Sequence, residues 1–177
     1  FAFAPPSGYL ALCSQNLPDV DIIDGTENFN TVLYTGNATD ATAISGVGFS
    51  PDWTWIKVRN NTNNHRLFDT VRGAGKDLIS NSTSAESTTT TRLQSFDSDG
   101  FTVGTNAEVN SNGHNIVAWN WLAGTAFSND ASATGVGTID SSGQVNTTAG
   151  FSIVSYTGTG SAGTIARLSR NENKKGT

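Results

Sequence analysis

Charged residues are scarce in this sequence, cysteine occurs once and methionine does not occur. Only 14% of the 177 residues are charged, with 15 acidic and 10 basic side chains. A single cysteine excludes an internal disulfide framework. The basic residues are scattered, which excludes a nucleic-acid footprint, and no apolar run approaches the roughly 20 residues of a transmembrane helix. We therefore expect no nucleic-acid partner and no membrane insertion.

Small polar residues take the place of the missing charges. The sequence holds 24 Thr, 19 Ser, 18 Asn and 19 Gly. This mixture disfavours helices, because threonine is β-branched, glycine is flexible, and serine and asparagine compete for backbone hydrogen bonds. Nine Phe, four Trp and three Tyr can still anchor a core. We predict an all-β protein with helix in fewer than about a tenth of its residues.

Apolar segments recur about every ten residues, with turn residues between them. This spacing predicts antiparallel β-sandwich or jelly-roll-like domains. The expected strands cover residues 43–49, 53–58, 66–71, 93–96, 101–103 and 116–122, with a hairpin turn at 97–100 and loops at 82–91 and 128–148.

One eight-residue pattern occurs twice. Residues 29–36 and 151–158 both read F-x-x-V-x-Y-T-G. A repeat this far apart indicates two like domains in tandem. The predicted division is residues 1–18 as the end of a preceding domain, 19–28 as a linker, 29–127 as the first copy, 128–148 as a linker loop and 149–177 as the start of a truncated second copy.

The first copy resembles a repeated domain of virion proteins from bacteriophages of marine bacteria and cyanobacteria. The resemblance rests on residues 29–36, 44–52, 55–57, 67–74, 95–101 and 117–121. Residues 1–18 resemble the closing strands of a SPRY/concanavalin-like lectin domain. Together they imply a structural tail-fibre or capsid-appendage protein on the virion surface, and no catalytic residues. The implied partners are copies of itself or other virion proteins, and a host-surface glycan or receptor.

Two kinds of side chain are candidates for specific roles. Trp53 and Trp55 could stack on sugar rings if their faces reach the surface, whereas Trp119 and Trp121 are expected in the core. Asp69 and Arg72 stand three residues apart, so that we expect an ion pair pinning their segment. For Trp121 we expect truncation to alanine to cost about 3–5 kcal/mol if the side chain is fully buried.

Few side chains could hold a metal ion or perform catalysis. Neither histidine, His65 or His114, has a cysteine or second histidine nearby, so we expect no metal and no cofactor. A loose calcium site in the 19–28 linker, with acids at 19, 21 and 24, is the one alternative, although the sequence fails the EF-hand pattern.

Two other functions stay open beside the virion protein. One is a secreted carbohydrate-binding β-sandwich module. The other is a polysaccharide depolymerase, for which Asp97, Asp99 and Glu108 are the available acids, although the first two are typical turn residues. We expect attachment and no enzymatic activity.

The second copy is predicted to be incomplete. The sequence begins with Phe1 and lacks methionine, which favours a fragment or a processed product. Residues 151–168 should then leave an unpaired sheet edge, and such edges are normally covered. We therefore expect residues 151–177 to lie near an interface between copies, threefold or in an array.

Overall fold

Antiparallel strands make up nearly all the regular structure in the computed structural model, which describes residues 7, 22 and 24–166. Within these residues the helices are α1 (Ala107–Asn110), α2 (Ala131–Thr134) and the 3-10 helix η2 (Gly25–Glu27). The strands are β1 (Phe29–Thr35), β2 (Thr42–Ser45), β3 (Trp53–Val58), β4 (Arg66–Asp69), β5 (Lys76–Ile79), β6 (Ser87–Thr88), β7 (Leu93–Asp97), β8 (Gly100–Val103), β9 (Asn115–Trp121), β10 (Thr125–Asn129), β11 (Ser141–Asn146) and β12 (Phe151–Tyr156). The all-β prediction is confirmed.

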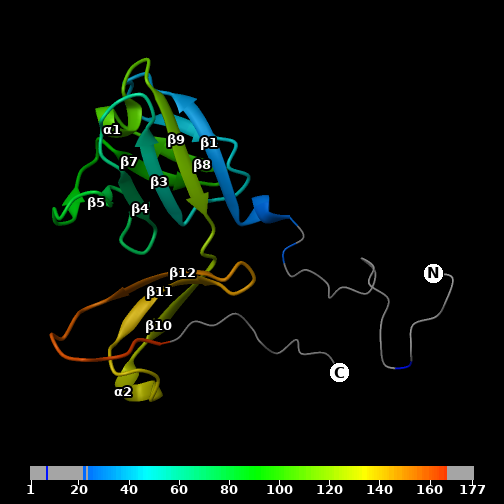
Figure 1. Cartoon of the computed structure of the whole chain (residues 1–177), viewed down its shortest axis with the longest axis vertical. Helices are drawn as coiled ribbons and strands as arrows, with labels where there is room; N and C mark the ends of the chain where they lie inside the picture. The colour runs from blue at the N-terminus through cyan, green and yellow to red at the C-terminus, as the bar shows by residue number, and fades with distance from the viewer. Residues whose placement is uncertain (1–6, 8–21, 23, 167–177) are drawn as a thin grey trace.

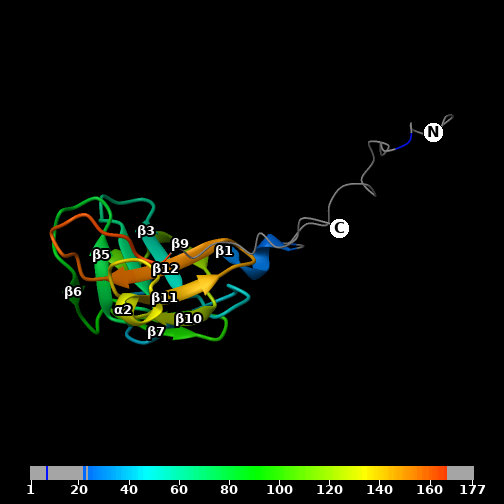
Figure 2. The ribbon, with the colours of Figure 1, turned by 90° about the horizontal axis from the view of Figure 1, so that it is seen from below.

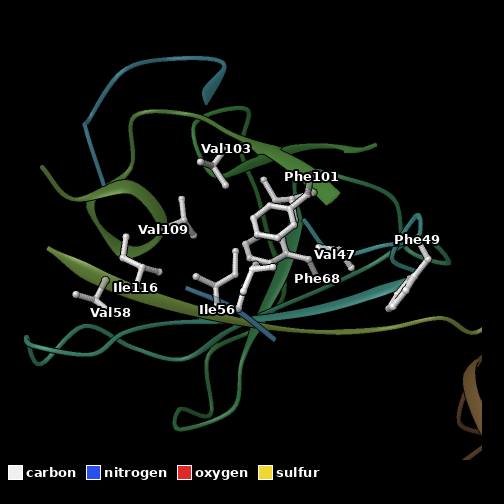
Figure 3. Packing of buried hydrophobic residues seen from close by; sticks show 12 residues of the cluster. Val47, Phe49, Ile56, Val58, Phe68, Phe101, Val103, Val109 and Ile116 are labelled. Atoms are coloured by element: carbon white, nitrogen blue, oxygen red, sulfur yellow. The ribbon is translucent and has the colours of Figure 1, made fainter. Parts of the chain in front are cut away.

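Two sheets face each other and enclose the core. The larger has the strand order β1-β9-β3-β4-β5-β6, and the smaller has the order β2-β8-β7 (Figure 1). Figure 3 shows apolar side chains from both sheets and from α1 meeting in the space between them. The core residues are Val32, Val47, Phe49, Ile56, Val58, Phe68, Leu93, Phe101, Val103, Val109, Ile116 and Ala118. The predicted sandwich is confirmed.

The alternation in β3 decides which residues reach this core. Thr54, Ile56 and Val58 point inward and are fully buried, whereas Trp53 and Trp55 lie on the outer face and are half-buried. The threonine is accommodated because its hydroxyl donates to the side-chain oxygen of Asn120 on β9, 3.0 Å away.

A third sheet, with the order β10-β11-β12, lies beyond one end of the sandwich (Figures 1 and 2). The loop predicted for residues 128–148 is therefore wrong, because this segment contains the end of β10, all of α2 and all of β11. Its Ser/Gly-rich composition has low strand propensity, but pairing with β12 supplies the hydrogen bonds. Gly143 is needed there, since a Cβ would lie 1.9 Å from the carbonyl oxygen of Ile153.

The repeated motif forms a strand in both places, but with different neighbours. β1 pairs with β9 in the sandwich, and β12 pairs with β11 in the third sheet. The lectin-like segment 1–18, apart from residue 7, and residues 19–21 and 23 of the 19–28 linker lie outside the described residues. At the end of that linker, Asp24 caps η2 by accepting from the backbone N–H of Thr26, 2.9 Å away.

The predicted 97–100 hairpin joins β7 to β8 and anchors a neighbouring loop. The carboxylate of Asp99 accepts from the backbone N–H groups of Gly48, at 2.6 Å, and Gly46, at 3.0 Å. Both glycines have φ near +90°, a conformation that other residues rarely adopt. The hydrogen bonds, that from Gly48 first, lower the pKa of Asp99 below its usual value.

Replacing Asp99 with asparagine should therefore remove an acid-sensitive part of the stability. A carboxyl group whose pKa is lower in the folded protein than in the unfolded chain contributes to the stability of the folded state. This contribution is complete above the unfolded pKa, near 3.9, and is lost as the pH falls through the folded pKa. At pH 6 we expect the parent to unfold at a higher urea concentration than Asp99→Asn. This difference between the two midpoints should fade below about pH 4. Asp40→Asn, which removes an exposed surface charge, is the control. A difference independent of pH would contradict this role of Asp99.

Candidate functional site

The outer face of the six-stranded sheet carries a concentration of aromatic side chains. Trp53 lies directly opposite Trp121, and Trp55 directly opposite Trp119, in the β3–β9 pairing. All four tryptophans are half-buried, and none belongs to the core. The prediction that Trp119 and Trp121 are core residues is wrong, because the inward positions of β9 are taken by Ile116, Ala118 and Asn120.

One part of this face centres on Trp55. Its ring contacts the rings of Trp119 and His65 edge-on, with centroids 5.5 and 5.6 Å apart. The indole N–H donates to Nδ1 of His65, 3.0 Å away. Burial, and then the positive charge of Lys57, lowers the pKa of His65. The neutral imidazole therefore remains an acceptor at neutral pH and fixes the orientation of Trp55.

Strand β12 covers the other part of the face. Phe151, at the start of β12, stacks on Trp121 with centroids 5.9 Å apart and meets Trp53 edge-on at 6.4 Å. Phe29 contacts the same Trp121 at 4.7 Å. Trp53 is thus held between the sandwich and the third sheet.

A groove of about 320 Å³ lies where β12 passes the sandwich. Trp53, Leu78 and Tyr156 supply apolar surface, and the last two are exposed over 37% and 56% of their area. Its other lining residues are Asp69, Val71, Arg72 and residues 152–155 of β12. The groove combines an indole, a phenol ring and charged groups in one concave surface.

The two predicted ion-pair residues do form an ion pair, and it lies in the wall of this groove. Nε of Arg72 is 2.5 Å from Oδ2 of Asp69. The same guanidinium donates to the carbonyl oxygen of Leu67 at 3.1 Å and to Glu86 at 3.2 Å. Four hydrogen bonds to three groups thus hold Arg72, counting the bond from its own backbone N–H to Asp69, so that its position is set without a ligand.

The sequence alone does not predict correctly which residues line the groove. It places Trp53 and Trp55 as candidate sugar contacts, but only Trp53 lines the groove. It gives no role to Leu78, and it predicts that Tyr156 packs inward or against a neighbouring strand, whereas the side chain is exposed over 56% of its area. A signal for Tyr156 exists in the repeat, since the tyrosine stands in a strand motif, but its exposure depends on what surrounds that strand.

The described residues contain no group of three or more His, Cys, Asp or Glu side chains placed to hold a metal ion. Two acids of the suggested calcium site, Asp19 and Asp21, lie outside the described part of the chain. The three candidate acids of a depolymerase have separate partners, since Asp97 accepts from Ser95 and Thr102, Asp99 from two glycines, and Glu108 from Arg66. In this part of the chain, no helix has the length and apolar character needed to cross a membrane.

A family model described as "Domain of unknown function (DUF7483)" matches residues 24–172. The chain belongs to this family. The match runs through the sandwich and the third sheet without a break, so that the family's unit includes both. No curated protein and no solved structure matches the chain.

Proposed function

We propose that this chain is a structural component of a bacteriophage virion, a tail fibre or capsid appendage exposed on the particle surface. In this role it attaches to a host-surface glycan or receptor and catalyses no reaction. The groove between β12 and the outer face of the sandwich is the observation that supports attachment best. Other virion proteins, or further copies of the chain, are its expected partners within the particle.

The groove has the chemistry that a sugar ring requires. Sugars present apolar C–H faces, which stack on indole and phenol rings, and hydroxyl groups, which need fixed polar partners. Trp53 and Tyr156 provide the rings, and the Asp69–Arg72 ion pair provides polar atoms whose positions are already set. A volume of about 320 Å³ lies at the lower end of the range for small-molecule sites, about 300–1,000 Å³.

Trp53→Ala and Trp55→Ala form a matched pair for testing this groove. Both tryptophans belong to β3 and share its outer face, but only Trp53 lines the groove. On an array of bacterial surface polysaccharides, we expect Trp53→Ala to weaken binding about tenfold, the value of one good aromatic contact. Trp55→Ala should stay within about twofold of the parent. Equal losses in both variants, or a parent that binds no polysaccharide, would reject the glycan role.

The location on a virion needs a separate experiment. Antibodies against the chain should label particles in immunogold electron microscopy, on tails or capsid appendages. A secreted carbohydrate-binding module, the second candidate for the same groove, would instead leave particles unlabelled while still binding polysaccharide. Release of reducing sugar from a bound polysaccharide would indicate a depolymerase.

A further inference from the structure

The motif shared by β1 and β12 has a clear structural reason in β1. Val32 is in the core, and the ring of Tyr34 meets Phe101 edge-on with centroids 6.3 Å apart. The hydroxyl of Tyr34 donates to the carbonyl oxygen of Val109 in α1, 2.7 Å away, and burial raises its pKa well above the usual value. The valine and tyrosine of the motif therefore serve contacts with the body of a sandwich.

The glycine of the motif is explained by the same sandwich. A Cβ on Gly36 would lie 2.1 Å from the backbone oxygen of Ser111, which follows α1. The backbone of Gly36 also donates to the carbonyl oxygen of His114 and accepts from the N–H of Gly113. Only glycine allows the chain after α1 to cross this closely.

In β12 the same three residue types lack these surroundings within the described residues. Tyr156, the counterpart of Tyr34, is exposed over 56% of its area, and Val154 is only half-buried. A Cβ on Gly158, the counterpart of Gly36, would meet nothing within 4 Å. No contact of the described chain requires glycine at this position.

The surroundings of β12 are also open. It is the last strand of its sheet and pairs only with β11 among the described strands. Two hollows of about 300 and 320 Å³ lie beside it, and Ser155 and Tyr156 line both. The edge of β12 that is unpaired among the described strands can accept a further strand, and the two hollows adjoin residues 152–157.

We propose that β12 is the docking strand of a second β-sandwich of this family, which covers it with a strand equivalent to β9 and a turn equivalent to α1. The tyrosine hydroxyl would then donate to the turn, and the backbone after the turn would cross Gly158. An unrelated strand could pair with the edge, but it would give no reason for glycine at 158 or tyrosine at 156. The inference does not depend on the proposed attachment to a host, but it buries Tyr156, so that Trp53 and the Asp69–Arg72 pair would line the glycan groove without that ring.

An extended chain tests this directly. It consists of residues 1–158 followed by residues 37–127 of the same sequence, so that β12 takes the place of β1 in the added sandwich. Hydrogen-exchange mass spectrometry should show exchange at residues 152–157 slowed at least about tenfold relative to the intact chain, because their amides become paired and buried. The added residues should show the protection pattern of residues 37–127 in the first copy.

Gly158→Val distinguishes this arrangement from any other. In the intact chain the substitution faces open space, and the melting temperature should change by no more than about 1–2 °C. In the extended chain it should abolish the slowed exchange at 152–157 and in the added copy. Gly25→Val, which also meets open space, should be neutral in both chains, and Gly36→Val should disrupt the first sandwich in both.

Two results would overturn the inference. One is an extended chain in which residues 152–157 and the added copy remain unprotected. The other is a Gly158→Val substitution with the same effect in both chains, which would mean that the glycine serves the chain as it stands. Polysaccharide binding is not used as a readout, so a failure here leaves the attachment proposal to its own tests.

Discussion

Replacing Asp77 with alanine should lower the free energy of unfolding by about 3–5 kcal/mol, because the carboxylate is the centre of a buried ion network. It is 1% exposed, and its two oxygens lie 2.5 Å from Nη1 of Arg66 and 2.6 Å from Nη1 of Arg92. Ser87 donates to it at 2.8 Å. Without Asp77, two largely buried guanidinium groups would share Glu108 as their remaining acidic partner.

Glu86→Ala is the matched control, since it also removes a carboxylate with two basic partners. Its side chain is 36% exposed, with Arg72 at 3.2 Å and Lys76 at 3.8 Å. Surface ion pairs contribute less than about 1 kcal/mol. Urea unfolding followed by tryptophan fluorescence would compare the two, and similar losses in both variants would show that burial does not decide the value of the network.

Asp52→Ala should cost about 3 kcal/mol and should loosen the third sheet in particular. Oδ2 accepts from the backbone N–H groups of Ala123 and Gly124, both at 2.8 Å. Oδ1 accepts from the side-chain amide of Gln144 on β11, at 3.0 Å. Charge-assisted hydrogen bonds to a nearly buried group contribute about 1.5–3 kcal/mol each, and their contributions do not add. The alanine variant leaves the donors of Ala123, Gly124 and Gln144 without this acceptor.

The hydrogen bonds of Asp52 to Ala123, Gly124 and Gln144 form a joint between the sandwich and the third sheet. Hydrogen exchange tests whether Asp52 stabilises this joint in particular or the whole protein equally. In Asp52→Ala, amides of β11 and β12 should exchange faster than those of β3 and β9, whereas Asp77→Ala should accelerate exchange in the sandwich strands. Asp52→Asn, which keeps one acceptor oxygen, should fall between the parent and the alanine variant. A uniform acceleration in Asp52→Ala would contradict a joint at this residue.

The sequence predicts the elements whose pattern is local. β3 alternates visibly, and the turn residues 97–100 define the hairpin of β7 and β8, so that both are found correctly. β5 is missed because it has only four residues and begins with the polar Lys76 and Asp77, and Asp77 is buried only because Arg66 on β4 and Arg92, just before β7, form ion pairs with it. Such pairing depends on contacts between distant segments, which no local pattern contains.

The errors around the third sheet and the tryptophans have a related cause. Ser141 and Gly143 have the composition of a loop, and only pairing with both neighbours makes β11 a strand. Alternation places Trp119 and Trp121 together on one face of β9, but it does not say which face. The choice is made by the fit of Ile116 and Ala118 between the two sheets. The candidate site was therefore only partly predictable, through Trp53 and the Asp69–Arg72 pair.

The joint at Asp52 also determines how the molecule carries mechanical load. Only Leu122, Ala123 and Gly124 separate β9 from β10, and Asp52, next to the start of β3, accepts from two of them while its N–H donates to the carbonyl oxygen of Trp121. Tension applied through the third sheet thus reaches two adjacent central strands together. Because Phe29 at the start of β1 lies opposite Trp121 at the end of β9, tension between the start of β1 and the third sheet would act on that end of the β1–β9 ladder and open its hydrogen bonds one after another.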